Sequence, residues 1–256
     1  MKSGYQVVLV TGASSGIGEA VAERFAAEQN RLVLIARRRD KLDTLAKRLS
    51  KQTACHVVAC DVTDHNRLQS EIESLPSEYR DVDVLVNNAG LALGLEPAQS
   101  VAWKNWQAMI DTNCTALAFI THMLLPGMVK RNRGHVVNIG SVAGSYPYRG
   151  GNVYAATKAF VEHFSKNLKA DLLGTSVRVT NIEPGMTAGS EFSLVRFGGD
   201  KEKADQVYAD TKPLTPESIA ESVFWAVSLP AHVNICRIEI MPVCQAPSRL
   251  AIHREA

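Results

Sequence analysis

The chain has 256 residues, of which 46% are hydrophobic and 21% are charged, and its formal net charge at pH 7 is +2. This composition excludes a disordered chain, and the length is typical of one open α/β sheet with helices on both faces. Lysine and arginine are scattered rather than gathered in a basic stripe, so we expect no nucleic-acid partner.

The cysteine content and the apolar runs indicate the compartment. Five cysteines form no CxxC pair, and their odd number indicates reduced thiols in the cytoplasm, with no structural metal site. No apolar stretch approaches the roughly 20 residues of a membrane span, and the first apolar run is too short for a signal-peptide core. We therefore expect a cytoplasmic protein with no membrane partner.

Short apolar runs rich in β-branched residues alternate along the chain with longer stretches of helical periodicity. The predicted strands are Val7–Thr11, Leu32–Ile35, His56–Cys60, Val82–Asn87, His135–Ile139, Val177–Ile182 and Ile235–Ile240. The predicted helices include Ile17–Glu28, Lys41–Leu49, Trp103–Met128, Val153–Leu172 and Pro216–Ser228. This alternation predicts a Rossmann-type, doubly wound parallel sheet of about seven strands with helices on both faces. Since no repeat or linker divides the chain, we expect a single domain over residues 1–256.

A glycine-rich turn separates the first predicted strand from the first predicted helix. Glycine allows a tight turn and a close approach to a pyrophosphate, and the start of a helix offers free N–H groups. The spacing is G-x-x-x-G-x-G rather than the more familiar G-x-G-x-x-G. We expect this turn to bind the phosphates of a dinucleotide through Gly12, Ser14, Ser15, Gly16, Ile17 and Gly18.

The end of the second predicted strand distinguishes NAD from NADP. An acidic residue there binds the ribose 2′-hydroxyl of NAD, whereas a basic residue accommodates the 2′-phosphate of NADP. This strand continues into Arg37 and Arg38, and the nearby Asp40 is expected to cap the next helix. The sequence therefore predicts NADP bound by Arg37 and Arg38, although a solvated helix start is an equal alternative for Arg38. By the same topology, Asp61 and Val62 are expected near the adenine.

Tyr154 and Lys158 lie four residues apart in a predicted helix, so their side chains share one face. A free phenol has a pKa of about 10 and is a slow proton shuttle at neutral pH. An ammonium group about 4 Å away, at an effective dielectric near 20, is worth roughly 4 kcal/mol, or about three pKa units. We therefore predict that Lys158, helped by an oxidised nicotinamide, lowers the pKa of Tyr154. The spacing alone is weak support, because Y-x-x-x-K occurs by chance in many helices.

Polar motifs follow the later predicted strands. Asn87, Asn88, Ala89 and Gly90 follow the fourth, Ser141 follows the fifth, and Pro184 and Gly185 follow the sixth. Together with the glycine turn and the Tyr154/Lys158 pair, these motifs resemble the short-chain dehydrogenase/reductase family from the first strand to the last. The resemblance implies that Tyr154 is the acid/base, that Ser141 steadies the substrate oxygen, and that Lys158 binds the nicotinamide ribose.

The resemblance also implies a fourth catalytic residue, Asn113, which would hold a water that links Lys158 to solvent. It implies that the cofactor is lined by Asn87, Asn88, Ala89, Gly90, Tyr154, Lys158, Pro184, Gly185 and Thr187. Thr187 would lie near the carboxamide, but this chain has Met186 and Thr187 where the family often has a second valine-like residue, so that contact could shift by one residue. The family forms dimers or tetramers through the helices predicted at Trp103–Met128 and Val153–Leu172, and we expect a homotetramer.

Longer stretches, such as NNAGLALGLEP at 87–97 and GGNVYAATKAFV at 150–161, resemble NADP-dependent 3-hydroxy acid dehydrogenases. The resemblance implies oxidation of L-allo-threonine, serine and 3-hydroxypropionate, and reduction of malonic semialdehyde. The carboxylate of such a substrate requires a cation or several N–H donors. Arg196 and Arg149 are the candidates, each with an exposed loop arginine as the alternative. Arg196 is preferred because it lies in the polar, glycine-containing segment 185–212, which we expect to close as a lid.

Two other functions use the same motifs. One is a reductase of another carbonyl, such as a ketoacyl thioester, a sugar or a bulky ketone. The other is a non-catalytic NADP-binding sensor, which the presence of both Tyr154 and Lys158 disfavours.

Overall fold

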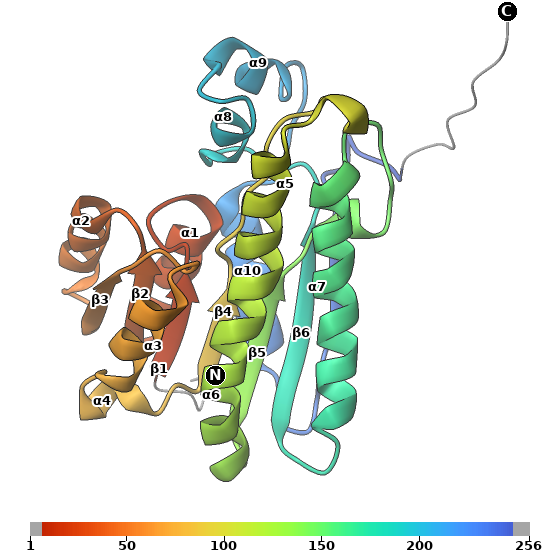
Figure 1. The fold of residues 1–256 in the computed structure, drawn as a ribbon. Helices are drawn as coiled ribbons and strands as arrows, with labels where there is room; N and C mark the ends of the chain where they lie inside the picture. The colour runs from red at the N-terminus through yellow and green to blue at the C-terminus, as the bar shows by residue number, and fades with distance from the viewer. Residues whose placement is uncertain (1–6, 248–256) are drawn as a thin grey trace, which may run out of the picture.

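The computed structural model describes residues 7–247, and within this range seven parallel strands form one sheet in the order β3-β2-β1-β4-β5-β6-β7 (Figure 1). The strands are β1 (Val7–Thr11), β2 (Arg31–Ala36), β3 (Cys55–Ala59), β4 (Val84–Asn87), β5 (Gly134–Ile139), β6 (Val177–Pro184) and β7 (Arg237–Ile240). The predicted Rossmann-type sheet is confirmed. The single domain predicted over 1–256 stays a prediction, and its residues 1–6 and 248–256 lie outside the described part of the chain.

Helices cover both faces of the sheet because the strands are apolar on both sides. Val8 and Val10 of β1 pack into one core, whereas Val7 and Leu9 pack into the other. The first core receives α1 (Gly16–Ala26), α2 (Arg39–Leu49) and α10 (Pro216–Ser228). The second receives α3 (His65–Glu73), α4 (Ser77–Arg80), α6 (Ala116–Lys130) and α7 (Asn152–Asp171). Near-continuous apolar strands are the expected result of burial on both faces.

Four short helices are absent from the sequence-based prediction. They are α3, α4, α8 (Phe192–Arg196) and α9 (Lys201–Gln206). In α3, polar residues surround the two apolar anchors, Leu68 and Ile72, that hold the helix to the core. The last two lie within the expected lid and stand above the sheet at the top of Figure 1.

The helix predicted at Trp103–Met128 is not regular. It consists of α5 (Trp103–Ile110), a π-helical turn η2 (Asp111–Thr115) and α6. A π turn carries an extra residue and often marks a functional position. This turn carries Asn113, which is 1% exposed.

This composite helix also corrects the prediction that no stretch is long enough to span a membrane. Within residues 7–247, the helical stretch Trp103–Lys130 has the length and composition of a span, with a mean hydropathy of 1.3 over an 18-residue window. Its apolar residues Ile120, Leu124 and Met128 are nevertheless buried in the core under the sheet. A core helix of a globular domain accounts for this hydropathy.

Candidate active site

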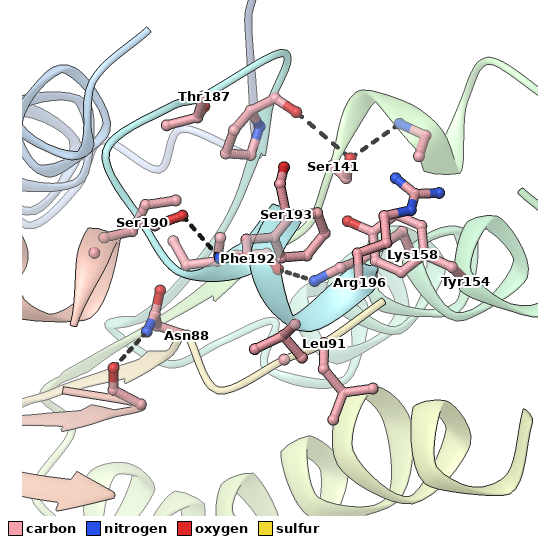
Figure 2. Close-up of a pocket in the computed structure, with 18 of the residues that line it drawn as sticks. Asn88, Leu91, Ser141, Tyr154, Lys158, Thr187, Ser190, Phe192, Ser193 and Arg196 are labelled. Atoms are coloured by element: carbon pink, nitrogen blue, oxygen red, sulfur yellow. Dashed lines mark hydrogen bonds between the residues drawn. The ribbon is translucent and has the colours of Figure 1, made fainter. Parts of the chain in front are cut away.

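A cavity of about 610 Å³ lies at the carboxyl ends of the strands (Figure 2). The turns after β1 to β6 all contribute to its wall, and Tyr154 and Lys158 enter it from α7. Of the predicted residues, the wall includes Gly12, Ser14, Ser15, Gly16, Ile17, Arg37, Arg38, Asp61, Val62, Asn88, Ala89, Gly90, Ser141, Tyr154, Lys158, Pro184, Gly185, Thr187 and Arg196. The structure therefore brings strand-end motifs that are far apart in the sequence to one site.

The turn after β1 leaves no space for a side chain at its glycines. Gly12 has a φ of +66°, and a Cβ there would lie 2.8 Å from the Asn88 amide nitrogen. Gly18 does not line the cavity: it is glycine because a Cβ would lie 2.4 Å from the Gly12 carbonyl oxygen. Asn88 donates to the carbonyl oxygens of Thr11 (2.9 Å) and Gly12 (3.2 Å), which fixes the turn. The start of α1 also lines the cavity. Its N-cap, Ser15, makes no side-chain cap hydrogen bond, so the N–H groups of the first turn are available to a phosphate.

Three cations follow β2; two of them, Arg37 and Arg38, line the cavity. The Arg37 side chain is 71% exposed, with its Nη1 atom 3.8 Å from Asp61. Arg38 donates from Nη2 to the hydroxyls of Ser14 and Ser15, both at 3.1 Å. Lys41 follows in α2. These three residues form what we call the cationic rim, whose charge fits a 2′-phosphate.

The prediction that Asp40 caps α2 is wrong. The helix begins at Arg39, Arg38 occupies the N-cap without a side-chain cap hydrogen bond, and Asp40 lies in the first turn. Its carboxylate still interacts favourably with the helix dipole there.

Ser141, Tyr154 and Lys158 meet where β5 ends against α7. The Ser141 Oγ atom accepts from the Ala143 N–H at 3.1 Å and lies 3.5 Å from the Pro184 carbonyl oxygen. Lys158 donates from Nζ to the Ile139 carbonyl oxygen at 2.8 Å. Tyr154 and Lys158 are each 7% exposed. Main-chain partners thus fix Ser141 and Lys158 at this end of the cavity.

The acidities at this end differ from the prediction. Burial raises the pKa of Tyr154 to about 12, while Ser141 and Arg196 act in the opposite direction. Burial lowers the pKa of Lys158 to about 8. The predicted lowering of the phenol pKa by Lys158 is wrong for this structure, because the ammonium is bonded to Ile139 and lies 6.0 Å from the centre of the Tyr154 ring.

Asn113 lies behind the cavity wall rather than in it. Its Oδ1 accepts from the Leu91 N–H and its Nδ2 donates to the Leu91 carbonyl oxygen, both at 2.9 Å. Nδ2 also lies 3.0 Å from the Thr157 hydroxyl, which belongs to the turn of α7 just before Lys158. Asn113 therefore ties the π turn to the loop after β4 and to the catalytic helix.

Asn87 does not line the cavity, contrary to the prediction. It is 3% exposed and donates to Thr121 and Asn138, both at 2.9 Å. As the last residue of β4, it shares a face of the sheet with Leu85 and points toward α6. Its role is to join two strands and a helix.

The segment 185–212 lies over the cavity. Phe192 of α8 packs against Tyr154, with ring centres 5.8 Å apart. Arg196 donates from Nη2 to the Tyr148 hydroxyl at 2.7 Å and from Nε to the Gly94 carbonyl oxygen at 3.2 Å. Its guanidinium carbon lies 5.5 Å from the centre of the Tyr154 ring, as the proximity of the two side chains in Figure 2 illustrates.

The structure does not bring Arg149 to the cavity. It is exposed and absent from the wall, because its neighbour Tyr148 takes the inward position. Several other wall residues were not predicted from the sequence: Tyr148, Glu191, Phe192, Tyr208 and Gln245. Gln245 accepts from the Met186 N–H at 2.6 Å, so the chain after β7 returns to the site. No local pattern in the sequence marks these positions.

The comparisons with known proteins agree with this geometry. A family model described as short chain dehydrogenase matches residues 6–194. An NADP-dependent 3-hydroxy acid dehydrogenase, YdfG, of Salmonella typhi is 53% identical over 97% of this chain and 99% of the relative. Sulfoacetaldehyde reductase 2 of Chromohalobacter salexigens is 49% identical over 97% of this chain and 99% of the relative.

A solved structure is similar throughout its length. It is the closed form of serine dehydrogenase complexed with NADP+, which has a TM-score of 0.94 and 50% sequence identity and covers 98% of this chain and 100% of its own.

Proposed function

This chain belongs to the short-chain dehydrogenase/reductase family, and we propose that it is an NADP-dependent dehydrogenase of short 3-hydroxy acids. In one direction it oxidises the 3-hydroxyl group of L-allo-threonine, serine or 3-hydroxypropionate. In the other it reduces malonic semialdehyde. The observation that carries the substrate class is Arg196, whose guanidinium lies in the same cavity as Tyr154 and Ser141.

NADP is the cofactor, and the residues of the cavity fit it. The crowded glycines after β1 and the start of α1 suit a pyrophosphate, and the cationic rim suits the 2′-phosphate. When bound, NADP accepts the hydride of the alcohol or donates it to the carbonyl.

The protein's own groups handle the proton and the substrate oxygen. As the phenolate, Tyr154 would accept the alcohol proton during oxidation; as the phenol, it would give a proton to the carbonyl oxygen during reduction. Ser141 orients that oxygen by hydrogen bonding. Lys158, whose ammonium is bonded to the Ile139 carbonyl oxygen, would bind the nicotinamide ribose, and Asn113 fixes the turn of α7 beside it. Burial keeps the phenol of Tyr154 protonated, so in this arrangement reduction starts with the acid already in the correct form.

Arg196 is the group we assign to the substrate carboxylate. Tyr148 and Gly94 orient its guanidinium, which leaves further N–H donors for an anion. The same chemistry would accept a sulfonate, so sulfoacetaldehyde is the substrate to compare with malonic semialdehyde. Arg149, being exposed, is not assigned a role.

We further propose a cytoplasmic homotetramer. The outer faces of α5 and α7 carry apolar side chains suited to such contacts, including Trp103 at 65% exposure and the stacked pair Phe160 and Phe164. Light scattering of the purified chain tests this assembly.

The function is tested by NADP(H)-coupled turnover over serine, L-allo-threonine, 3-hydroxypropionate, malonic semialdehyde, sulfoacetaldehyde, an acetoacetyl thioester and a neutral aldehyde of similar size. We expect the anionic substrates to be preferred. Arg196→Gln should raise their KM by about 10- to 100-fold, which corresponds to loss of a charge-assisted pair worth about 1.5–3 kcal/mol, and leave the neutral aldehyde unchanged. Arg149→Gln is the matched control. Equal activity of wild type and Arg196→Gln on the acids would refute the assignment, and a preference for the thioester would favour the other reductase function.

A further inference from the structure

Glu191, just before α8, connects the segment above the cavity to the cationic rim. Its Oε2 lies 2.6 Å from Nη1 of Arg38, and its Oε1 accepts from Nζ of Lys41 at 2.8 Å. Lys41, with Arg38, holds the pKa of the Glu191 carboxyl below its usual range. The carboxylate is therefore charged at neutral pH and bonded to both cations.

Arg38 uses its other edge for the phosphate turn. While Nη1 contacts Glu191, Nη2 donates to the hydroxyls of Ser14 and Ser15. One guanidinium thus joins the glycine turn, the start of α2 and the segment above the cavity. A planar group with five N–H donors is suited to such a three-way contact.

The other end of α8 reaches the catalytic end of the cavity. Phe192 contacts the Tyr154 ring, and Arg196 lies over it at the last residue of the helix. The main chain at Arg196 is fixed as well, because its carbonyl oxygen accepts from the Gly94 N–H at 2.8 Å. Since α8 has only five residues, its position depends on its contacts. These are the contacts at its two ends and, in its middle, the hydrogen bond of 2.7 Å between the hydroxyls of Ser193 and Tyr208.

We propose that Glu191 is a positioning residue: through Arg38 and Lys41 it holds α8 over Tyr154, and so it sets where Arg196 meets the substrate. This inference rests on the proposed function for its kinetic consequence, but the structural role of Glu191 can be measured without the cofactor. The cations of the rim then have two tasks, since they receive the cofactor phosphate and also anchor the helix above the substrate.

The proposal predicts that loss of the Glu191 carboxylate changes KM but not kcat. Ser141, Tyr154 and Lys158 are fixed by β5 and α7, which Glu191 does not touch. Without its carboxylate, α8 is expected to leave the cavity more often, so KM for the acid rises while kcat at saturation changes little. An ordinary surface ion pair contributes little and would move neither constant.

The primary variant is Glu191→Gln, which keeps the shape of the side chain and removes its charge. Amide hydrogen exchange of residues 190–197 in the cofactor-free protein should become several-fold faster. KM for the 3-hydroxy acid should rise about three- to tenfold, with kcat within about twofold of wild type, and Glu191→Asp should recover part of both losses. The matched control is Glu202→Gln, a change of the same kind in an exposed residue of α9.

A double-variant cycle with Arg38→Met isolates the pair. If the two residues act together, the combined variant should exchange at 190–197 no faster than the worse single variant. Unchanged exchange in Glu191→Gln, or strictly additive effects in the cycle, would overturn the proposal. Absence of acid turnover in wild type would instead overturn the proposed function, and the exchange measurement would still decide the position of α8.

Discussion

The two ends of the cavity are built in opposite ways. At the catalytic end, Tyr154 and Lys158 are 7% exposed, and Lys158 is bonded to a main-chain oxygen of β5. At the cationic rim, the Arg37 side chain is 71% exposed. Arg38 and Lys41 are both bonded to the Glu191 carboxylate, and Arg38 also donates to the hydroxyls of Ser14 and Ser15. A buried polar group has a large desolvation cost and one arrangement, whereas an exposed one is screened by water and can change partners. Substitutions should therefore have effects that decrease from the catalytic end to the rim.

The largest effect is expected for Tyr154→Phe. It removes only the hydroxyl of a buried side chain, so packing is retained while the acid/base is lost. We expect kcat/KM to fall by about 10²–10⁴-fold in both directions, with NADPH affinity within about threefold of wild type by titration calorimetry. Turnover within tenfold of wild type would mean that another group moves the proton.

Lys158→Met should lower activity and raise stability. The folded-state pKa of Lys158, about 8, is below its ordinary value of 10.5, so the buried charge destabilises the fold fully below pH 8. That cost declines as the pH rises from 8 toward 10.5. We expect the variant to gain about 1–2 kcal/mol in free energy of unfolding at pH 7, after allowing for the lost bond to Ile139, and to gain progressively less at higher pH.

The denaturant midpoint measured at pH 7 and pH 10 checks this pH dependence. An equal gain at both values would show that desolvation of Lys158 is not the cause. Activity should fall by at least about 10²-fold, because the group assigned to the ribose is gone.

Asn113→Ala tests a residue that supports the catalytic end of the cavity without lining it. It removes three hydrogen bonds and leaves both main-chain groups of Leu91 without their partner. We expect a loss of about 2–3 kcal/mol in stability, or several degrees in Tm, measured by calorimetry. Asn113→Asp keeps the acceptor for the Leu91 N–H, but it buries a charge and sets a second carboxylate oxygen against the Leu91 carbonyl oxygen, so it should be at least as destabilising as Asn113→Ala. If Asn113→Ala is as stable as wild type, other contacts hold the π turn in place.

The smallest effect on the fold is expected at the rim. Arg37→Asp should weaken NADP binding by about tenfold relative to NAD and leave Tm within about one degree, because the side chain is exposed. Arg39→Asp is the control, since Arg39 is equally close in sequence but bonds to Asp43 and is absent from the cavity wall. Unchanged discrimination between the two cofactors in Arg37→Asp would remove Arg37 from the phosphate site.

The sequence predicted best the features that follow from strand ends. A parallel sheet brings all carboxyl ends of its strands to one edge, so Gly12, Ser141 and Gly185 could be placed together without a structure. Asn87 is an exception: it has the same parity as Leu85, so it lies on the face of β4 that is covered by α6 and bonds to Thr121 there.

Other features depend on three-dimensional contacts. Four-residue spacing places Tyr154 and Lys158 on one face of a helix, but it does not fix the distance between a flexible ammonium and a ring, and here a strand-end carbonyl attracts Lys158. Glu191 and Tyr148 are distant in sequence from the groups they bind, and no periodicity relates them. Such contacts arise only when the segment after β6 folds back over the sheet.

The π turn between α5 and α6 sets the helical phase of one helix relative to the other. An α-helix advances about 100° per residue, so the additional residue of a π turn rotates everything before it by about that angle relative to everything after it. Before the turn, Met109 faces the apolar cluster around Tyr154; after it, Ile120 and Met128 face the sheet. Deleting one residue from 111–115 would restore a continuous helical phase and direct one of these two apolar stripes into water. The length of this turn, and not only the identity of Asn113, is thus a condition for the site.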